Sequence, residues 1–136
     1  MAAHVNVSFN QHVKLPAEVA YRLLCDWEDH SRWVSLTKVE VHSSDSFTAY
    51  TGIGPLRLKD RMQVLSRDDE QRAVVVVKLG PVLTGSAGFK VKTYSATSCV
   101  VSWTEELHIP YLPGFTAILL RPLTRLLFRR ALRRLA

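Results

Sequence analysis

The sequence predicts an α+β fold in which a curved antiparallel sheet of seven strands wraps around one long C-terminal helix. Seven segments are predicted as strands: several alternate apolar and polar side chains with the period of two that a strand with one buried face requires, and 72–79 is a β-branched run. Short stretches rich in Gly, Ser, Asp and Pro separate them, as tight turns between antiparallel strands do. From residue 115 onward the apolar side chains recur with the period of an α-helix.

One strand and two short helices are predicted at the start of the chain. Apolar and polar residues alternate over 5–13, which indicates a strand with one buried face. Pro16 ends this strand and suits the first turn of a helix over 17–24. Asp26 then begins a second helical turn over 26–30, because an Asp at a helix start satisfies free backbone N–H groups.

Six further strands are expected to form a meander in chain order. Their predicted ranges are 37–42, 47–51, 57–66, 72–79, 84–94 and 99–108. The apolar inner face of such a sheet must be covered, and the long helix is the element available to cover it. A strongly curved sheet closed by one helix leaves a concave space between them, where ligands bind.

The C-terminal helix combines leucines with arginines. One stripe with helical spacing is expected to face the sheet: Leu120, Leu123, Leu127 and Ala131. Pro122 is expected either to kink this helix or to mark its true start. Leu119 and Leu126 lie among the arginines and away from the stripe, as in a helix at a membrane interface.

The net charge of +6 comes from this last helix. Residues 115–136 contain six arginines and no acid, while the rest of the chain holds 12 basic and 12 acidic residues. Three interpretations stay open: a solvated face, docking on an anionic membrane, or a protein or nucleic-acid partner. Specific nucleic-acid recognition is not expected, because the arginines alternate with leucines rather than with aromatic or polar readers. The arginines predicted to meet a membrane are Arg121, Arg125, Arg129 and Arg133.

Composition and the N-terminal residues predict a soluble, cytoplasmic protein. No run of about 18 apolar residues and no signal-peptide pattern is present. Cys25 and Cys99 fit no metal-binding spacing and are expected to be reduced, buried thiols. The histidines also lack such spacing, so neither a metal nor a cofactor is expected. Both a monomer and a dimer remain open.

Three segments carry a resemblance to a known family. Residues 15–19 read Leu-Pro-Ala-Glu-Val, residues 24–33 fit the pattern L-x-D-x-x-x-x-x-x-W, and 113–115 read Pro-Gly-Phe before the last helix. Together they resemble the START/Bet v1-like (SRPBCC) superfamily in its polyketide cyclase/dehydrase and lipid-transport branch. The resemblance implies a helix-grip fold, a single domain over 1–136 and an internal hydrophobic cavity. It does not imply one function, because members include cyclases, lipid carriers and hormone receptors.

The inward positions supply the expected wall of this cavity. The predicted lining residues are Phe9, Trp33, Leu58, Asp60, Met62, Val76, Phe89, Trp103, Glu105, Tyr111, Phe115, Leu120, Leu123 and Leu127. Ordinary core packing would use the same side chains, so the volume of the space decides between core and cavity.

Two carboxylates are the main candidates for chemistry. Asp60 and Glu105 fall on apolar strand faces, where a carboxylate must be paired, hydrogen-bonded or neutralised. Facing one cavity, they could titrate near neutrality and transfer protons. Alternatively, a strand bulge turns one of them to solvent, or an arginine or the N–H group of Trp33 pairs with it. His108, beside Tyr111 at the expected cavity mouth, is the third catalytic candidate.

The predicted function is the binding of a small hydrophobic ligand, a lipid or a polyketide-like molecule, by a carrier or sensor. The alternative is an enzyme of the cyclase or dehydratase type that uses the cavity carboxylates without a metal or cofactor. A third hypothesis is an interaction module that acts through the arginine-rich helix.

Overall fold

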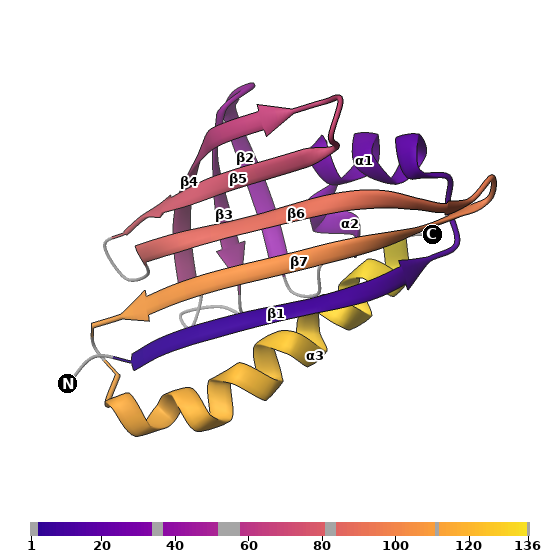
Figure 1. Cartoon of the computed structure of the whole chain (residues 1–136). Helices are drawn as coiled ribbons and strands as arrows, with labels where there is room; N and C mark the ends of the chain where they lie inside the picture. The colour runs from indigo at the N-terminus through magenta and orange to yellow at the C-terminus, as the bar shows by residue number, and fades with distance from the viewer. Residues whose placement is uncertain (1–2, 34–36, 52–57, 81–83, 111, 136) are drawn as a thin grey trace.

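A computed structural model describes residues 3–33, 37–51, 58–80, 84–110 and 112–135 (Figure 1). The elements follow the predicted order: β1 (Ala3–Val13), α1 (Ala17–Cys25), α2 (His30–Trp33), β2 (Thr37–Ser43), β3 (Ser46–Thr51), β4 (Leu58–Asp68), β5 (Ala73–Leu79), β6 (Thr84–Ser95), β7 (Ser98–Ile109), the 3-10 turn η2 (Gly114–Thr116) and α3 (Ala117–Leu135). Three predicted lining residues lie outside this description: Tyr111 entirely, and Trp33 and Leu58 for their side chains.

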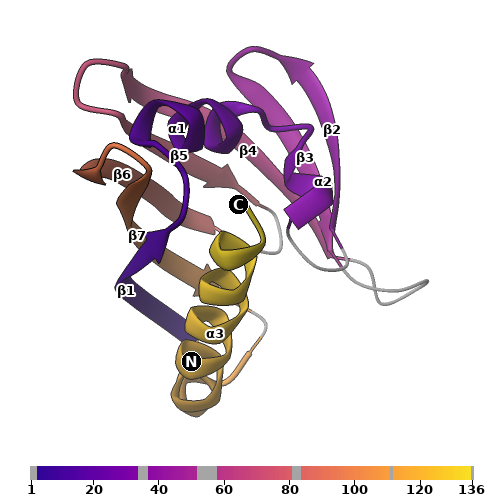
Figure 2. The ribbon, with the colours of Figure 1, turned by 90° about the vertical axis from the view of Figure 1, so that its right-hand side faces the viewer.

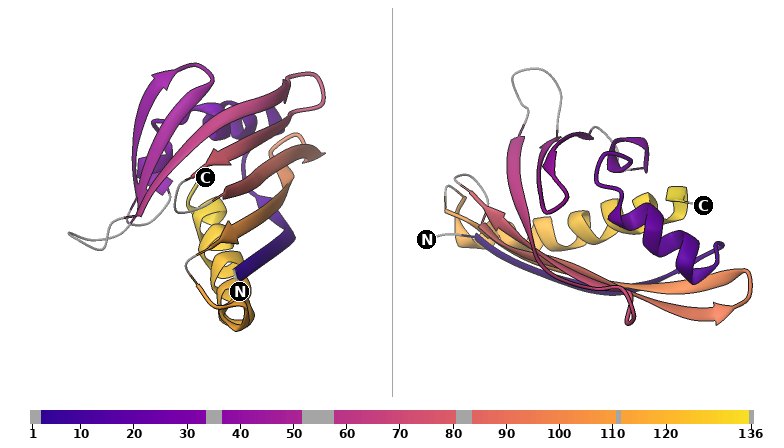
Figure 3. Two further views of the ribbon diagram at one scale, coloured as in Figure 1. Left: turned by 90° about the vertical axis from the view of Figure 1, so that its left-hand side faces the viewer. Right: turned by 90° about the horizontal axis from the view of Figure 1, so that it is seen from above.

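The seven strands form one antiparallel sheet in the order β1-β7-β6-β5-β4-β3-β2. Strands β2 to β7 pair in chain order, as the meander predicted, and β1 adds to the far edge beside β7. The sheet curves so that its concave side faces α3 (Figure 3). The predicted fold class, a helix-grip arrangement of sheet and long helix, is therefore confirmed.

Strand alternation and register decide which side chains enter the concave face. Glu105 pairs with Ala87 on one side and Val7 on the other, and Asp60 pairs with Ala49. The irregularity of β4 comes later, between Val64 and Ser66. Neither carboxylate is turned to solvent by a bulge, and both side chains are buried on the concave face of the sheet.

Helices α1 and α3 cover the concave side from different ends (Figures 2 and 3). Helix α1 packs on β6 and β7, and the Tyr21 hydroxyl donates a 2.6 Å hydrogen bond to Asp69 in the β4–β5 turn. Arg72 in the same turn pairs with Glu18 at 2.6 Å. These contacts fix α1 over one end of the sheet and leave the remaining concave surface to α2 and α3.

The face of α3 that packs against the protein differs from the predicted leucine stripe. Leu123 is 60% exposed and Leu127 is 37% exposed, so their assignment to the inward face was wrong. The buried or half-buried positions are Ala117, Leu120, Thr124, Phe128, Arg129, Ala131, Leu132 and Leu135. Leucines occur on several sides of this helix, so periodicity alone does not select the contact face. The observed face includes two buried alanines, Ala117 and Ala131.

Pro122 lies inside α3, which begins five residues earlier at Ala117. It therefore does not mark the start of the helix. A proline removes the backbone hydrogen bond to the carbonyl four residues before it, here that of Ile118. Both residues are exposed, so solvent can hydrate this carbonyl. No helix in the described ranges is long and apolar enough to cross a membrane.

Candidate functional site

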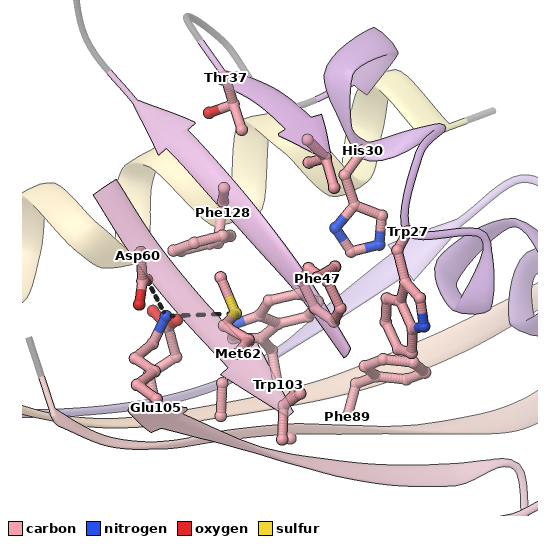
Figure 4. Close-up of a pocket in the computed structure, with 16 residues that line it drawn as sticks. Trp27, His30, Thr37, Phe47, Asp60, Met62, Phe89, Trp103, Glu105 and Phe128 are labelled. Atoms are coloured by element: carbon pink, nitrogen blue, oxygen red, sulfur yellow. Dashed lines mark hydrogen bonds and ion pairs between the residues drawn. The ribbon is translucent and has the colours of Figure 1, made fainter. Parts of the chain in front are cut away.

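A cavity of about 100 Å³ lies on the concave side of the sheet, between β2–β7 and the inward face of α3 (Figure 4). Its walls are formed by Trp27, His30, Thr37, Val39, Phe47, Ala49, Asp60, Met62, Val76, Lys78, Ala87, Gly88, Phe89, Trp103, Glu105 and Phe128. Six predicted lining residues are among them: Asp60, Met62, Val76, Phe89, Trp103 and Glu105. The interior is therefore not filled solidly by side chains.

One end of the cavity holds three ionisable side chains from three strands. The Nζ atom of Lys78 on β5 lies 2.6 Å from Oδ2 of Asp60 on β4, and both side chains are almost fully buried. Glu105 reaches the same end from β7 and is 3% exposed (Figure 4). We call Asp60, Lys78 and Glu105 the charge cluster. A buried ion pair of this kind is strongly coupled to its surroundings, because loss of one partner leaves a buried charge.

The Glu105 carboxyl group has an unusual proton affinity. Burial raises its pKa to about 7; the Lys78 ammonium opposes this rise and the Asp60 carboxylate adds to it. The group can therefore gain or lose a proton near neutral pH. In addition, Oε2 of Glu105 and Oδ1 of Asp60 are buried and accept no hydrogen bond from a described residue. Both oxygens remain available to a hydrogen-bond donor inside the cavity.

The other end of the cavity is aromatic. Trp27 and Phe47 stack with their ring centroids 4.7 Å apart, and the indole N–H of Trp27 donates to the Ser44 carbonyl at 3.2 Å. A second stack runs from Phe89 on β6 through Trp103 on β7 to Phe128 on α3, extending along the cavity toward the charge cluster, with centroid separations of 5.8 and 5.0 Å (Figure 4). Stacked rings from separate elements give this end a flat, apolar surface.

His30 closes the aromatic end from α2. Its Nε2 atom lies 2.8 Å from the Leu24 carbonyl oxygen, and the ring meets Trp27 edge-on at 5.4 Å. Burial lowers the pKa of this imidazole, so its neutral form is favoured at neutral pH. A neutral imidazole whose Nε2 hydrogen bonds to a backbone carbonyl carries its proton on that nitrogen. His30 thus contributes a positioned, uncharged wall.

Several predicted site residues lie elsewhere. His108 points opposite to Glu105, because neighbouring side chains of a strand alternate in direction. On the outer face of the sheet its Nδ1 atom lies 3.1 Å from Nε2 of His4, so its placement at the cavity mouth was wrong. Phe115 is 71% exposed, like the exposed Leu123 and Leu127 of α3, and these three residues do not line the cavity.

Two further predicted lining residues are interior but away from the cavity. Phe9 is buried under Arg129, whose guanidinium carbon lies 5.0 Å from the ring centroid. Leu120 is half-buried and packs against the core. Both support the fold rather than the cavity wall, which is the core-packing alternative left open by the sequence.

Sequence reasoning missed Lys78, Trp27, His30, Phe47 and Phe128 as lining residues. A signal for Lys78 existed, because it alternates with Val74 and Val76, which are buried on the same face. The run of valines on both faces of β5 hid this alternation. Phe128 was missed because the leucine stripe was chosen as the inward face of α3.

The family follows from a match over nearly the whole sequence. Residues 4–136 match the family described as polyketide cyclase / dehydrase and lipid transport. The chain belongs to this polyketide cyclase/dehydrase and lipid transport family. The superfamily resemblance seen in the sequence is thereby confirmed. No curated protein matches the chain in sequence at a significant level.

Solved structures of proteins in this superfamily share the fold of this chain. The Zhui aromatase/cyclase of Streptomyces sp. R1128 is 15% identical, with a TM-score of 0.71 over 96% of this chain and 87% of that chain. A START superfamily protein of Mycobacterium smegmatis is 13% identical, with a TM-score of 0.74 over 98% and 92%. Norcoclaurine synthase of Thalictrum flavum is 13% identical, with a TM-score of 0.65 over 96% and 86%. At these identities the likeness concerns the fold.

Proposed function

We propose that this polyketide cyclase/dehydrase and lipid transport family member binds a small apolar molecule in the cavity, as a carrier or sensor. The observation that carries this proposal is a cavity with an aromatic end and an end formed by the charge cluster. Apolar pockets with a few convergent polar groups are typical ligand sites. The aromatic stacks would hold the apolar part of the ligand, and the charge cluster would fix its orientation.

The volume restricts the size of the ligand. A dry cavity of about 150 Å³ holds a benzene-sized molecule, and drug-sized ligands occupy about 300–1,000 Å³. The present cavity, at about 100 Å³, is smaller than this reference, so a short hydrocarbon segment fits and a single ring needs a slight widening of the space. A lipid chain or a fused polyketide ring system would need the space to widen, for example by movement of α3.

The charge cluster restricts the polarity of the ligand. Oδ1 of Asp60 and Oε2 of Glu105 are buried and have no hydrogen-bond donor among the described residues. They favour a ligand that carries a hydroxyl or amine group. Such a donor would replace the water that an isolated buried carboxylate otherwise requires. The proposed ligand is therefore one aromatic ring or short chain with a hydrogen-bond donor at one end.

Calorimetric titration with phenol and toluene tests this proposal, because the two have similar apolar bodies and only phenol has a donor. Phenol is expected to bind at least about tenfold more tightly than toluene. Glu105→Gln should reduce this preference, while Glu106→Gln, its exposed neighbour on β7, should not. Equal affinities for phenol and toluene in all three proteins would reject the polar end; no binding of either would reject the cavity as a ligand site.

A second function, acid–base catalysis of the cyclase or dehydratase type, is favoured by the pKa of Glu105. The Glu105 carboxylate would take a proton from the carbon next to a ligand carbonyl group, and the electron pair would move onto the carbonyl oxygen. The Lys78 ammonium would donate a hydrogen bond to this enolate oxygen, while Asp60 positions Lys78. Glu105 then returns the proton to another atom of the ligand enolate, which completes the step without any redox change.

Exchange of the methyl protons of acetophenone in D₂O, followed by NMR, tests this second function. The rate above the buffer background should rise with pH and level off above about 7, where Glu105 is ionised. Glu105→Gln should reduce exchange to background, while Glu106→Gln should retain it. Undiminished exchange by Glu105→Gln would contradict the catalytic role and leave ligand binding unaffected.

A further inference from the structure

The outer face of α3 exposes large apolar side chains that no other element of the described chain covers. Ile118 is 74% exposed, Leu119 66%, Leu123 60% and Leu126 53%. Phe115, in the turn before the helix, is 71% exposed. At helical spacing Leu119, Leu123 and Leu126 form one stripe opposite the buried face, so they share a surface rather than being scattered. We call these five residues the apolar patch.

Exposed arginines accompany this apolar patch on α3: Arg130 and Arg133 continue the leucine stripe at helical spacing, whereas Arg121 and Arg125 lie on other sides of the helix. Arg121, Arg125, Arg130 and Arg133 are exposed, and the structure shows no ion pair between any of them and a described carboxylate. The sequence of α3 contains no acidic residue. Arg129 differs from the membrane-contact prediction, because it is half-buried, lies over the Phe9 ring and donates to Gln11 at 3.4 Å. Arg129 therefore packs against β1 and is not part of the outer surface.

An ordinary solvated helix does not have this surface. Its outer face usually mixes charges of both signs and exposes few large apolar residues. The outer face of α3 instead combines leucines with charge of a single sign, while the rest of the chain is balanced at 12 basic and 12 acidic residues. A partner must therefore offer both an apolar phase and dense negative charge.

We propose that the outer face of α3 docks on an anionic lipid membrane, with the apolar patch entering the headgroup–acyl boundary and the arginines contacting lipid phosphates. Interfacial helices bind in this way, and long arginine side chains can keep their charge at the headgroup level while their stems lie against apolar neighbours. The docked helix would still present Phe128 to the cavity from its other side. Docking would thus bring the proposed ligand site next to the bilayer.

Two other partners fit this surface less well. A second copy of the chain would bring the arginines of two α3 helices together, and like charges repel. A nucleic acid would supply phosphates, but its backbone offers no apolar phase for the apolar patch. Of these three partners, the anionic bilayer alone supplies both negative charge and an apolar phase at one planar surface.

Flotation with lipid vesicles tests the proposal on the full chain. The vesicles contain phosphatidylcholine alone or with about one third phosphatidylglycerol. Binding is expected to be at least about tenfold stronger to the anionic vesicles. It should weaken by a similar factor between 0.1 and 1 M NaCl, because the Debye length falls from about 10 to about 3 Å.

Two sets of variants separate the apolar and electrostatic contributions. We expect each of two multiple variants to reduce binding at least about tenfold. The first removes apolar side chains, Leu119→Ser/Leu123→Ser/Leu126→Ser, and the second removes charge, Arg121→Gln/Arg125→Gln/Arg130→Gln/Arg133→Gln. The apolar control is Leu65→Ser, because Leu65 on β4 is 68% exposed. The charge control replaces four exposed lysines in one variant, Lys14→Gln/Lys38→Gln/Lys59→Gln/Lys92→Gln. Both controls should bind as the wild type does. Circular dichroism and thermal unfolding would confirm that every variant folds.

The remaining outcomes overturn the proposal. These are equal binding to neutral and anionic vesicles, absence of binding to both, and binding that the three serine substitutions leave unchanged. A dimer in sedimentation experiments that the same serine variant dissociates would assign the apolar patch to a second copy. The assay needs no cavity ligand, and Glu105→Gln should float as the wild type does, so its result is independent of the proposed ligand binding.

Discussion

The two faces of β7 place neighbouring carboxyl groups in opposite environments. Glu105 points to the concave side, is 3% exposed and has a pKa raised to about 7. Glu106 points to the outer side and is exposed to solvent. The same contrast separates buried Lys78 from the exposed lysines of the other strands. Residue type therefore says little about function here, whereas the side of the sheet decides whether a charge interacts with water or with another charge.

Removal of the buried cation should produce the largest difference between the two faces. Lys78→Ala leaves the carboxyl groups of Asp60 and Glu105 buried without their cation, which we expect to cost about 3–5 kcal/mol of unfolding free energy. Lys59→Ala, at an exposed position of β4, should cost less than about 0.5 kcal/mol. Urea unfolding measures both values, and similar losses for the two variants would contradict a special role of the concave face.

The pH dependence of stability should reveal the buried environment of Glu105 on the concave face. The pKa of Glu105 in the folded state, about 7, lies above the ordinary value of 4.5. The folded protein therefore binds this proton more tightly than the unfolded chain does. The Glu105 contribution to stability is fully present below about pH 4.5 and is lost as pH rises to about 7.

Comparison of Glu105→Gln with the wild type isolates this contribution. The stability of Glu105→Gln relative to the wild type should rise between about pH 4.5 and 7 by about 3 kcal/mol. Denaturant unfolding at several pH values measures the difference, and parallel curves for Glu105→Gln and the wild type would show that Glu105 titrates normally.

Two alanines should distinguish the cavity from the packed interior. Ala20 on α1 is fully buried in the core, so Ala20→Leu should overpack it and cost about 1–3 kcal/mol. Ala87 lines the cavity, so Ala87→Leu should cost less than about 1 kcal/mol because its added carbons enter open space. Thermal unfolding compares the variants, and phenol titration should show lost binding for Ala87→Leu alone. Equal destabilisation by the two would indicate a closely packed cavity site.

The smallest effect is expected at the histidine pair on the outer face. His108→Ala removes the contact with the exposed His4 and should change the unfolding free energy by less than about 0.5 kcal/mol. Phenol affinity should be unchanged, because His108 does not line the cavity. A reduced affinity in the same titration would show that the two faces of the sheet are coupled.

Local periodicity was sufficient for the elements of the fold. Alternation over 84–94, for example, placed Ala87 and Phe89 inward, and both are buried. The same alternation placed Asp60 and Glu105 inside, because a strand fixes the direction of each side chain relative to its neighbours. Periodicity failed for α3, where leucines lie on more than one side and several faces satisfy the helical pattern. In β5, whose apolar residues occupy both faces, it placed Val76 in the cavity wall but missed Lys78 two residues later on the same face.

The sequence by itself determined the order of strands and helices, the inward direction of Asp60 and Glu105 and the excess charge of the last helix. These properties depend on neighbours along the chain. The tertiary structure alone decided that Lys78 pairs with Asp60, that Trp27 and Phe128 enter the cavity wall, and that His108 faces outward beside His4. Such contacts join strands and helices far apart in the chain, and they are set by sheet register and by the rotation of α3 rather than by local pattern.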